Sequence, residues 1–138
     1  MNREQIMQVL PHRAPMLLVD SIEPQPDGSV LASYTVPEKP FFCEGHFPGN
    51  PIVPGVILCE MMAQSCCMLF ADAFKENLLV YRSMDQVKFR AEVHPCDTCE
   101  IHARLVEHKG SVYMCDVNLS VEGKRCAQGR ITLAAVPR

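Results

Sequence analysis

The feature that most constrains this chain is an apolar run from Val56 to Ala71 that contains one charged residue, Glu60. Because Pro54-Gly55 precedes the run, we expect a helix over about Val56–Phe74 that is buried on most of its sides. Glu60 and Gln64 stand four residues apart, so they share one face of this helix. A helix that is apolar all round is poorly covered by one sheet. We therefore expect a dimer, joined edge to edge through its sheets or through its helices.

The rest of the pattern is mainly β. Asn2 can cap a short helix that Pro11 stops. Residues 100–107 and 113–121 alternate between apolar and polar positions, which is typical of half-buried strands. The sequence thus predicts an α+β domain in which an antiparallel sheet wraps the long helix. The expected strands are Met16–Ile22, Ser29–Val36, Leu78–Gln86, Glu100–Glu107, Tyr113–Val121 and a last strand that runs to about Val136.

Composition excludes several functional classes. The chain has 138 residues, 48% of them hydrophobic, and a net charge of -3, so we expect one domain, spanning residues 1–138, and no nucleic-acid partner. The apolar run is too short, and too interrupted by Glu60 and Gln64, to cross a bilayer. The N-terminus lacks the apolar segment of a signal peptide. We expect a cytoplasmic protein that does not insert into membranes.

Eight cysteines raise the question of disulfides or metal. Without an export signal, reduced thiols are expected. Cys96 and Cys99 have the spacing of a zinc knuckle, with His94 and His102 on either side, but a lone Cys-x-x-Cys is a weak signal. The alternating residues after Cys99 indicate that the chain runs directly into a strand, which would carry His102 away. We expect no metal site here.

His46 lies in a loop over residues 41–51 that is rich in proline and glycine. Each proline fixes a backbone dihedral, so the loop is stiff and suits the positioning of a catalytic side chain. An imidazole near a carboxyl group with a raised pKa is the minimum equipment for moving protons at neutral pH. The alternatives are a structural loop histidine and, for Glu60, a carboxylate paired with an arginine at the surface.

Two further residues are candidates on general grounds. The N–H of Gly55 belongs to the first turn of the long helix, where the helix dipole would stabilise negative charge on an oxygen of a bound molecule. Gln64 either forms hydrogen bonds around Glu60 or is plain polar packing. Arg82, Lys88 and Arg90 form a small basic cluster, which is either a solvated face or a docking patch for an acidic partner.

Four segments resemble a known family. Leu10-Pro11-His12-Arg13-Ala14-Pro15-Met16-Leu17-Leu18-Val19-Asp20 is similar to the N-terminal signature of bacterial 3-hydroxyacyl-acyl-carrier-protein dehydratases of the FabZ type. Gly45-His46-Phe47-Pro48-Gly49-Asn50-Pro51-Ile52-Val53-Pro54-Gly55-Val56 resembles their catalytic loop, and Glu60-Met61-Met62-Ala63-Gln64 the start of their central helix. Met84-Asp85-Gln86-Val87-Lys88-Phe89 resembles the strand that follows.

The resemblance implies a hot-dog fold and a homodimer, often three dimers in a hexamer. It implies removal of water from a (3R)-3-hydroxyacyl thioester on acyl carrier protein to give the trans-2-enoyl product in fatty acid synthesis. His46 would be the base and Glu60 the acid, from different subunits, with no cofactor. Ile52 would hold the His46 ring through its carbonyl, and Gly55 would bind the thioester oxygen.

Two departures and two alternatives accompany this resemblance. The family usually has glycine where this chain has Cys96, so that turn is expected to differ. Cys59, Cys66 and Cys67 populate the helix densely. The width of an acyl tunnel beside it, and so the preferred acyl chain length, is left open. The alternatives are a hot-dog thioesterase, which the pairing of His46 with Glu60 fits less well, and a non-catalytic acyl-thioester-binding protein, which would be favoured by a broken pair.

Overall fold

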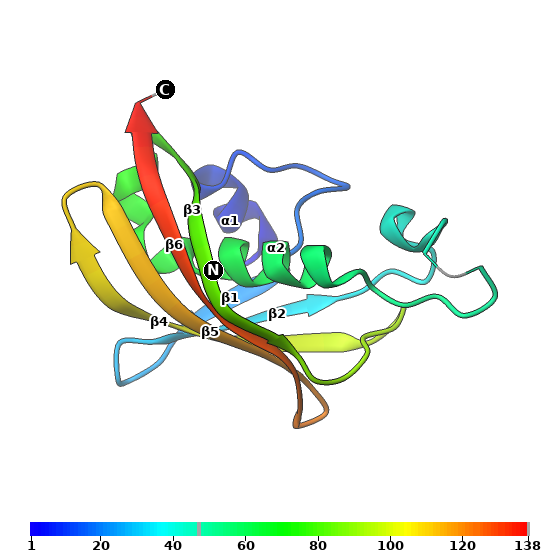
Figure 1. Ribbon diagram of the computed structural model, residues 1–138. Helices are drawn as coiled ribbons and strands as arrows, with labels where there is room; N and C mark the ends of the chain where they lie inside the picture. The colour runs from blue at the N-terminus through cyan, green and yellow to red at the C-terminus, as the bar shows by residue number, and fades with distance from the viewer. Residues whose placement is uncertain (47, 138) are drawn as a thin grey trace.

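The computed structural model describes residues 1–46 and 48–137; Phe47 of the loop motif and Arg138 lie outside the described residues. Helices and strands follow the predicted α+β pattern, with one curved sheet and a helix lying across it (Figure 1). The elements are α1 (Arg3–Val9), β1 (Ser21–Pro24), β2 (Val30–Thr35), η1 (Phe41–Cys43), α2 (Gly55–Ser65), η2 (Cys67–Phe74), β3 (Asn77–Phe89), β4 (Thr98–Lys109), β5 (Val112–Val121) and β6 (Lys124–Pro137).

The α1 helix begins as its sequence predicts. The Asn2 side chain accepts from the Gln5 backbone N–H at 2.9 Å, and the Gln5 side chain accepts from the Asn2 N–H at 2.8 Å. This reciprocal capping box satisfies two of the donors that a helix start leaves unpaired. Ile6 is the buried anchor of the helix.

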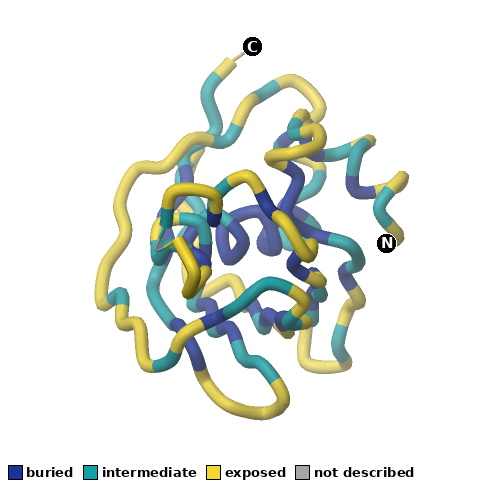
Figure 2. The backbone as a smooth tube through the Cα atoms, turned by 90° about the vertical axis from the view of Figure 1, so that its right-hand side faces the viewer, coloured by how far each residue is buried: buried dark blue, intermediate teal, exposed yellow. Residues whose placement is uncertain are grey.

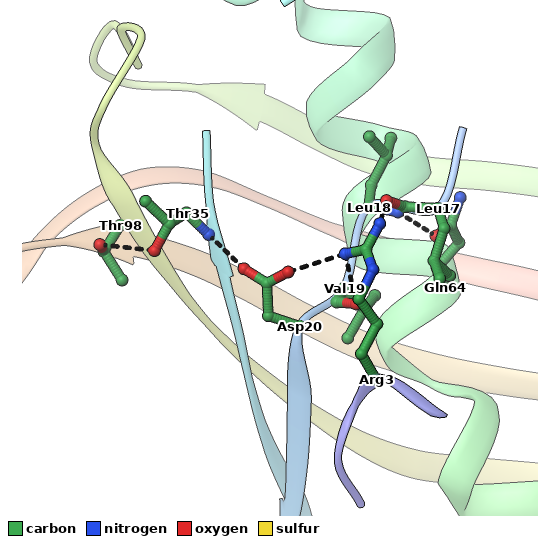
Figure 3. Close-up of polar contacts among 8 residues, drawn as sticks. All are labelled: Arg3, Leu17, Leu18, Val19, Asp20, Thr35, Gln64 and Thr98. Atoms are coloured by element: carbon green, nitrogen blue, oxygen red, sulfur yellow. Dashed lines mark hydrogen bonds and ion pairs between the residues drawn. The ribbon is translucent and has the colours of Figure 1, made fainter. Parts of the chain in front are cut away.

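The segment from Met16 to Asp20, predicted as the start of a strand, is not one. The backbone of Leu17 and Leu18 bonds to side chains: Leu18 N–H donates to Gln64 Oε1 at 2.8 Å, and Arg3 Nη2 donates to the Leu17 carbonyl at 3.2 Å (Figure 3). Pairing with β2 begins only at the end of the segment, where the Asp20 N–H donates to the Ser33 carbonyl at 2.7 Å. Asp20 then accepts from both Arg3 and the Thr35 N–H, each at 2.8 Å. Only Ser21–Pro24 pairs as a strand, with β2.

The six strands form one antiparallel sheet in the order β1-β2-β4-β5-β6-β3. The side chains that face α2 make up the core, and they include Ile101, Leu119 and Ile131, all fully buried. Figure 2 shows the dark blue turns of buried helix at the centre of the molecule, enclosed by the rest of the chain.

The long helix is shorter than predicted. It runs from Gly55 to Ser65 and then bends by 66° into the 3₁₀ segment η2. At the bend, Ser65 Oγ donates to the Met61 carbonyl at 2.7 Å and Cys66 Sγ donates to the Met62 carbonyl at 3.3 Å. Such bonds to the carbonyl four residues earlier compete with the helix ladder and bend it.

The β3 strand is an edge strand, paired on one side with β6. It is longer than predicted, and most of its residues are exposed. Several of them are apolar, which is unusual for a free sheet edge because it invites pairing with another strand. These exposed residues are Leu78, Val80, Tyr81, Met84 and Phe89.

Over the described residues, no single helix is long and apolar enough to cross a membrane, although the bent pair α2–η2 meets the length and composition criteria.

Candidate active site

The His46 loop is held in place by backbone contacts. His46 Nδ1 lies 2.8 Å from the Ile52 carbonyl oxygen, the contact that the resemblance implied. The same carbonyl accepts from Cys43 Sγ at 3.5 Å, and the Val53 N–H donates to the Val93 carbonyl at 2.8 Å. When Nδ1 carries the proton and donates to Ile52, Nε2 presents the lone pair that a general base needs.

His46 lines a cleft of about 560 Å³ at the start of α2. The walls are mainly apolar, as expected of a site for an acyl chain. The lining residues are His46, Ile52, Val53, Gly55, Val56, Leu58, Phe89, Arg90, Ala91, Glu92 and Val93.

Gly55 lies where α2 meets this cleft. A Cβ at Gly55 would lie 2.9 Å from the end of the Phe89 ring, so a larger residue would displace the ring from the helix start. The Pro54 carbonyl already accepts from the Ile57 and Leu58 N–H groups. The Gly55 N–H belongs to the first turn, whose donors have no acceptor within the helix, and it sits at the positive end of the helix dipole.

Glu60 is held by three donors from its own chain. Tyr81 Oη donates to Oε1 at 2.6 Å, Gln64 Nε2 donates to Oε2 at 2.8 Å, and His12 Nε2 lies 3.3 Å from Oε2. The Glu60 side chain is 19% exposed. Its neighbours are therefore a histidine, an amide and a phenol, and the alternative of a surface pair with an arginine is wrong.

The expectation of a raised pKa at Glu60 is also wrong for the chain taken by itself. Burial acts to raise the pKa, but the hydrogen bonds from His12, Gln64 and Tyr81 outweigh it and lower the pKa of Glu60 to about 2. The pKa of Tyr81 shifts in the opposite direction: burial and the Glu60 carboxylate raise it well above its usual value. Glu60 is thus a carboxylate at neutral pH in this arrangement.

Both ends of the Gln64 side-chain amide form hydrogen bonds. Its Oε1 accepts from the Leu18 N–H, and its Nε2 donates to both the Met16 carbonyl and Glu60, all at 2.8 Å. These contacts fix which end of the amide faces Glu60. They also attach the N-terminal signature segment to the helix, so Gln64 is more than plain polar packing.

Tyr81 was missed by the sequence reasoning, and His12 was noted only as a match to the family. Tyr81 pairs with Leu133, which is 5% exposed, so both side chains face α2. A bulge directly after Tyr81 then shifts the register. The strand predicted over Leu78–Gln86 includes no bulge, so it could not reveal this change of face.

The single chain does not bring His46 and Glu60 together. Within residues 1–46 and 48–137, the hydrogen bonds of Glu60 run to Tyr81, Gln64 and His12, and Glu60 is not part of the cleft that His46 lines. Instead, His46 and Glu60 lie near different points along the strand β3. Tyr81 on this strand contacts Glu60, and Phe89 at its end adjoins the cleft.

The cysteines and histidines of the knuckle-like segment also lie apart. Cys96 is exposed and Cys99 is buried, while His102 Nε2 lies 3.0 Å from Ser29 Oγ. In the described part of the chain, no three His, Cys, Asp or Glu side chains are placed to share a metal ion. All eight cysteines, each of them described, carry free thiols.

Comparison with known proteins identifies the family. The family model described as ApeI dehydratase matches residues 22–130. A curated relative from Streptococcus equi subsp. zooepidemicus, named 3-hydroxyacyl-[acyl-carrier-protein] dehydratase FabZ, is 39% identical and covers 97% of both chains. The chain belongs to the FabZ-type dehydratase family.

Other members agree. FabZ of Lactococcus lactis subsp. cremoris is 36% identical over 96% of this chain and 94% of its own. FabZ of Nitratidesulfovibrio vulgaris is also 36% identical, over 97% of this chain and 90% of its own. The resemblance drawn from the loop and helix motifs is therefore confirmed.

Solved structures confirm the fold. The ApeI:P dehydratase heterocomplex from Xenorhabdus doucetiae superimposes with a TM-score of 0.81 at 20% identity, covering 96% of this chain and 91% of that one. A mutant thioesterase from Pseudomonas aeruginosa gives a TM-score of 0.69 at 19% identity over 100% and 96% of the two chains. The α+β hot-dog prediction is confirmed, and this FabZ-type chain shares its architecture with enzymes of different chemistry.

Proposed function

We propose that the protein removes water from (3R)-3-hydroxyacyl-acyl-carrier-protein to give the trans-2-enoyl thioester in fatty acid biosynthesis. The observation behind the proposal is the combination of a FabZ-type chain with His46 oriented by Ile52 beside an apolar cleft and a Glu60 carboxylate held by three donors. We place the enzyme in the cytoplasm as a single hot-dog domain that uses no cofactor and binds no metal.

In the proposed reaction His46 Nε2 takes a proton from C2 of the acyl chain. The electron pair of that C–H bond forms the C2=C3 double bond while the C3–O bond breaks. Negative charge that develops on the thioester oxygen is stabilised by the Gly55 N–H at the helix start. The imidazolium formed at His46 gives its proton to the departing hydroxyl, which leaves as water, so the enzyme returns to its starting state.

Glu60 orients the hydroxyl that leaves. A carboxylate has about four lone-pair sites, and the donors Gln64, His12 and Tyr81 occupy three of them. The last site, on Oε1, can accept from the C3 hydroxyl. This assigns Glu60 the role of acceptor, whereas the resemblance implied an acid.

The proposed working unit is a homodimer, with a trimer of dimers as its larger form. If two β3 edges pair antiparallel about a two-fold axis near the middle of the strand, the Phe89 end of one strand lies opposite the Tyr81 region of the other. That arrangement would set the His46 cleft of one chain against Glu60 of its partner. It explains why the single chain holds the two groups apart.

The carrier protein would approach the open end of the cleft. Arg90, one of the three basic residues noted in the sequence, lines the cleft beside His46. Carrier proteins that are acidic would be attracted by such a residue.

One assay tests this function. The purified protein is given a 3-hydroxyacyl thioester of acyl carrier protein, and enoyl absorbance and free thiol are followed together. We expect enoyl product without thiol release, and a loss of about 10²–10⁴-fold on His46→Ala. Thiol release without enoyl product would instead assign a thioesterase.

A further inference from the structure

Glu60 presents two oxygens with different surroundings. Oε2 accepts from Gln64 at 2.8 Å and faces His12 Nε2 at 3.3 Å, whereas the described contact of Oε1 is Tyr81 at 2.6 Å. Each carboxylate oxygen has room for about two donors. Oε2 is therefore full, and Oε1 keeps one position for a further donor.

The two donors that face Oε2, Gln64 and His12, have fixed orientations. The Gln64 amide is locked by the Leu18 N–H and the Met16 carbonyl, so its N–H must point at Glu60. His12 Nδ1 is buried without a hydrogen-bond partner among the described residues. A proton on Nε2 is the arrangement that places a donor toward the carboxylate and avoids a buried, unpaired N–H at Nδ1.

Tyr81 comes to Oε1 from β3, a separate element. Its pairing with Leu133 turns the ring toward α2, and the bulge at Arg82 allows Met84, which pairs with the fully buried Ile131, to face the same way. Bulges of this kind re-aim side chains. The Tyr81 residue is 43% exposed in the single chain, so its hydroxyl stands at the open side of Glu60.

We propose that Tyr81 is a positioning residue for Glu60: its hydroxyl occupies one lone pair of Oε1 and so directs the remaining one at the C3 hydroxyl of the substrate. The proposal rests on the function proposed above. Tyr81 acts through Glu60 and needs no contact with the acyl chain. The groups that face Glu60 are His12 from the N-terminal segment, Gln64 from α2 and Tyr81 from β3.

A double-mutant cycle tests this role. Tyr81→Phe keeps the ring and removes the donor, so kcat should fall about tenfold, the value of one hydrogen bond to a charged group, while KM stays within about twofold. In the Glu60→Gln background the same substitution should change kcat by less than about twofold, because the partner charge is gone. Tyr113→Phe, the same change at a tyrosine that packs on Phe70 and His108, should have no effect in either background.

An equal tenfold loss of kcat from Tyr81→Phe in both backgrounds, or a loss confined to KM, would show that Tyr81 touches substrate and would overturn the proposal.

A second measurement does not depend on turnover. The side-chain carboxyl of Glu60 is followed by carbon-13 NMR against pH, and its signal is assigned by its absence from Glu60→Gln. Loss of the Tyr81 donor should raise the pKa of Glu60, so this carboxyl should protonate at a higher pH in Tyr81→Phe than in the unsubstituted protein or in Tyr113→Phe. Identical titrations would contradict the inference. If the unsubstituted protein forms no enoyl product, the proposed function fails while this titration still decides the role of Tyr81.

Discussion

Cys96 has a backbone conformation that glycine adopts more easily than cysteine. Its φ is 71°, in the left-handed region, and its N–H donates to the Val36 carbonyl at 2.9 Å. The following Asp97 closes the turn by accepting from the His94 N–H at 2.9 Å. The resemblance implies glycine at this position and therefore a different turn. The φ of Cys96 lies where glycine is favoured, so this chain holds a side chain in a strained conformation.

Replacing Cys96 by glycine should therefore stabilise the protein. We expect the free energy of unfolding to rise by about 0.5–1 kcal/mol, because relief of the left-handed strain outweighs the extra chain entropy of glycine. Chemical denaturation measures this directly. Cys96→Ala is the matched control, since it also removes the thiol but keeps a Cβ, and it should leave stability unchanged. Equal effects of the two substitutions would point to the thiol and not to the backbone.

At the scale of elements, α2 is attached to the N-terminal segment by one amide. Gln64 is 3% exposed and satisfies the Leu18 N–H, the Met16 carbonyl and Glu60 together. This contact also explains why residues 16–20 are not a strand. A pattern of apolar residues cannot reveal that their backbone partner is a side chain 46 residues away.

Gln64→Ala should cost about 2–3 kcal/mol of unfolding free energy, since it leaves a buried backbone N–H and a carbonyl without partners. Gln8→Ala, at an exposed position of α1, is the control and should change little. Urea titrations of both variants make the comparison. A Gln64→Ala protein as stable as the control would mean that water replaces the amide without loss.

The elements that sequence predicted best are those with a clear period. The paired strands β4, β5 and β6 follow from alternation and from two tight turns, and the loop motif led directly to His46 and Ile52. The break in the helix at Ser65 and the bulge after Tyr81 were not predictable. Both depend on where a hydroxyl or an extra residue sits relative to neighbours that are distant in sequence, and hydropathy does not record this.

At the scale of the whole molecule, the exposed apolar edge of β3 favours pairing with another strand. Met84 lies in the middle of this strand, is 45% exposed, and faces the α2 side of the sheet. In the proposed dimer it would be buried between two chains. An unpaired charge introduced there would be buried as well, which is strongly unfavourable.

Met84→Asp should thus convert the dimer to monomer, as measured by light scattering after size exclusion. Val106→Asp is the control, because Val106 is 38% exposed on β4, away from this edge. It should remain a dimer. If both variants keep the mass of the parent protein, the interface lies elsewhere.

In the proposed dimer, His46 of one chain works with Glu60 of its partner. The most direct test mixes His46→Ala protein with Glu60→Gln protein, each with only residual activity by itself, under conditions where subunit exchange is verified by mass. A shared site predicts that part of the dehydratase activity returns, because a mixed dimer rebuilds one intact site of its two. No recovery despite verified exchange would show that each site is built within a single chain.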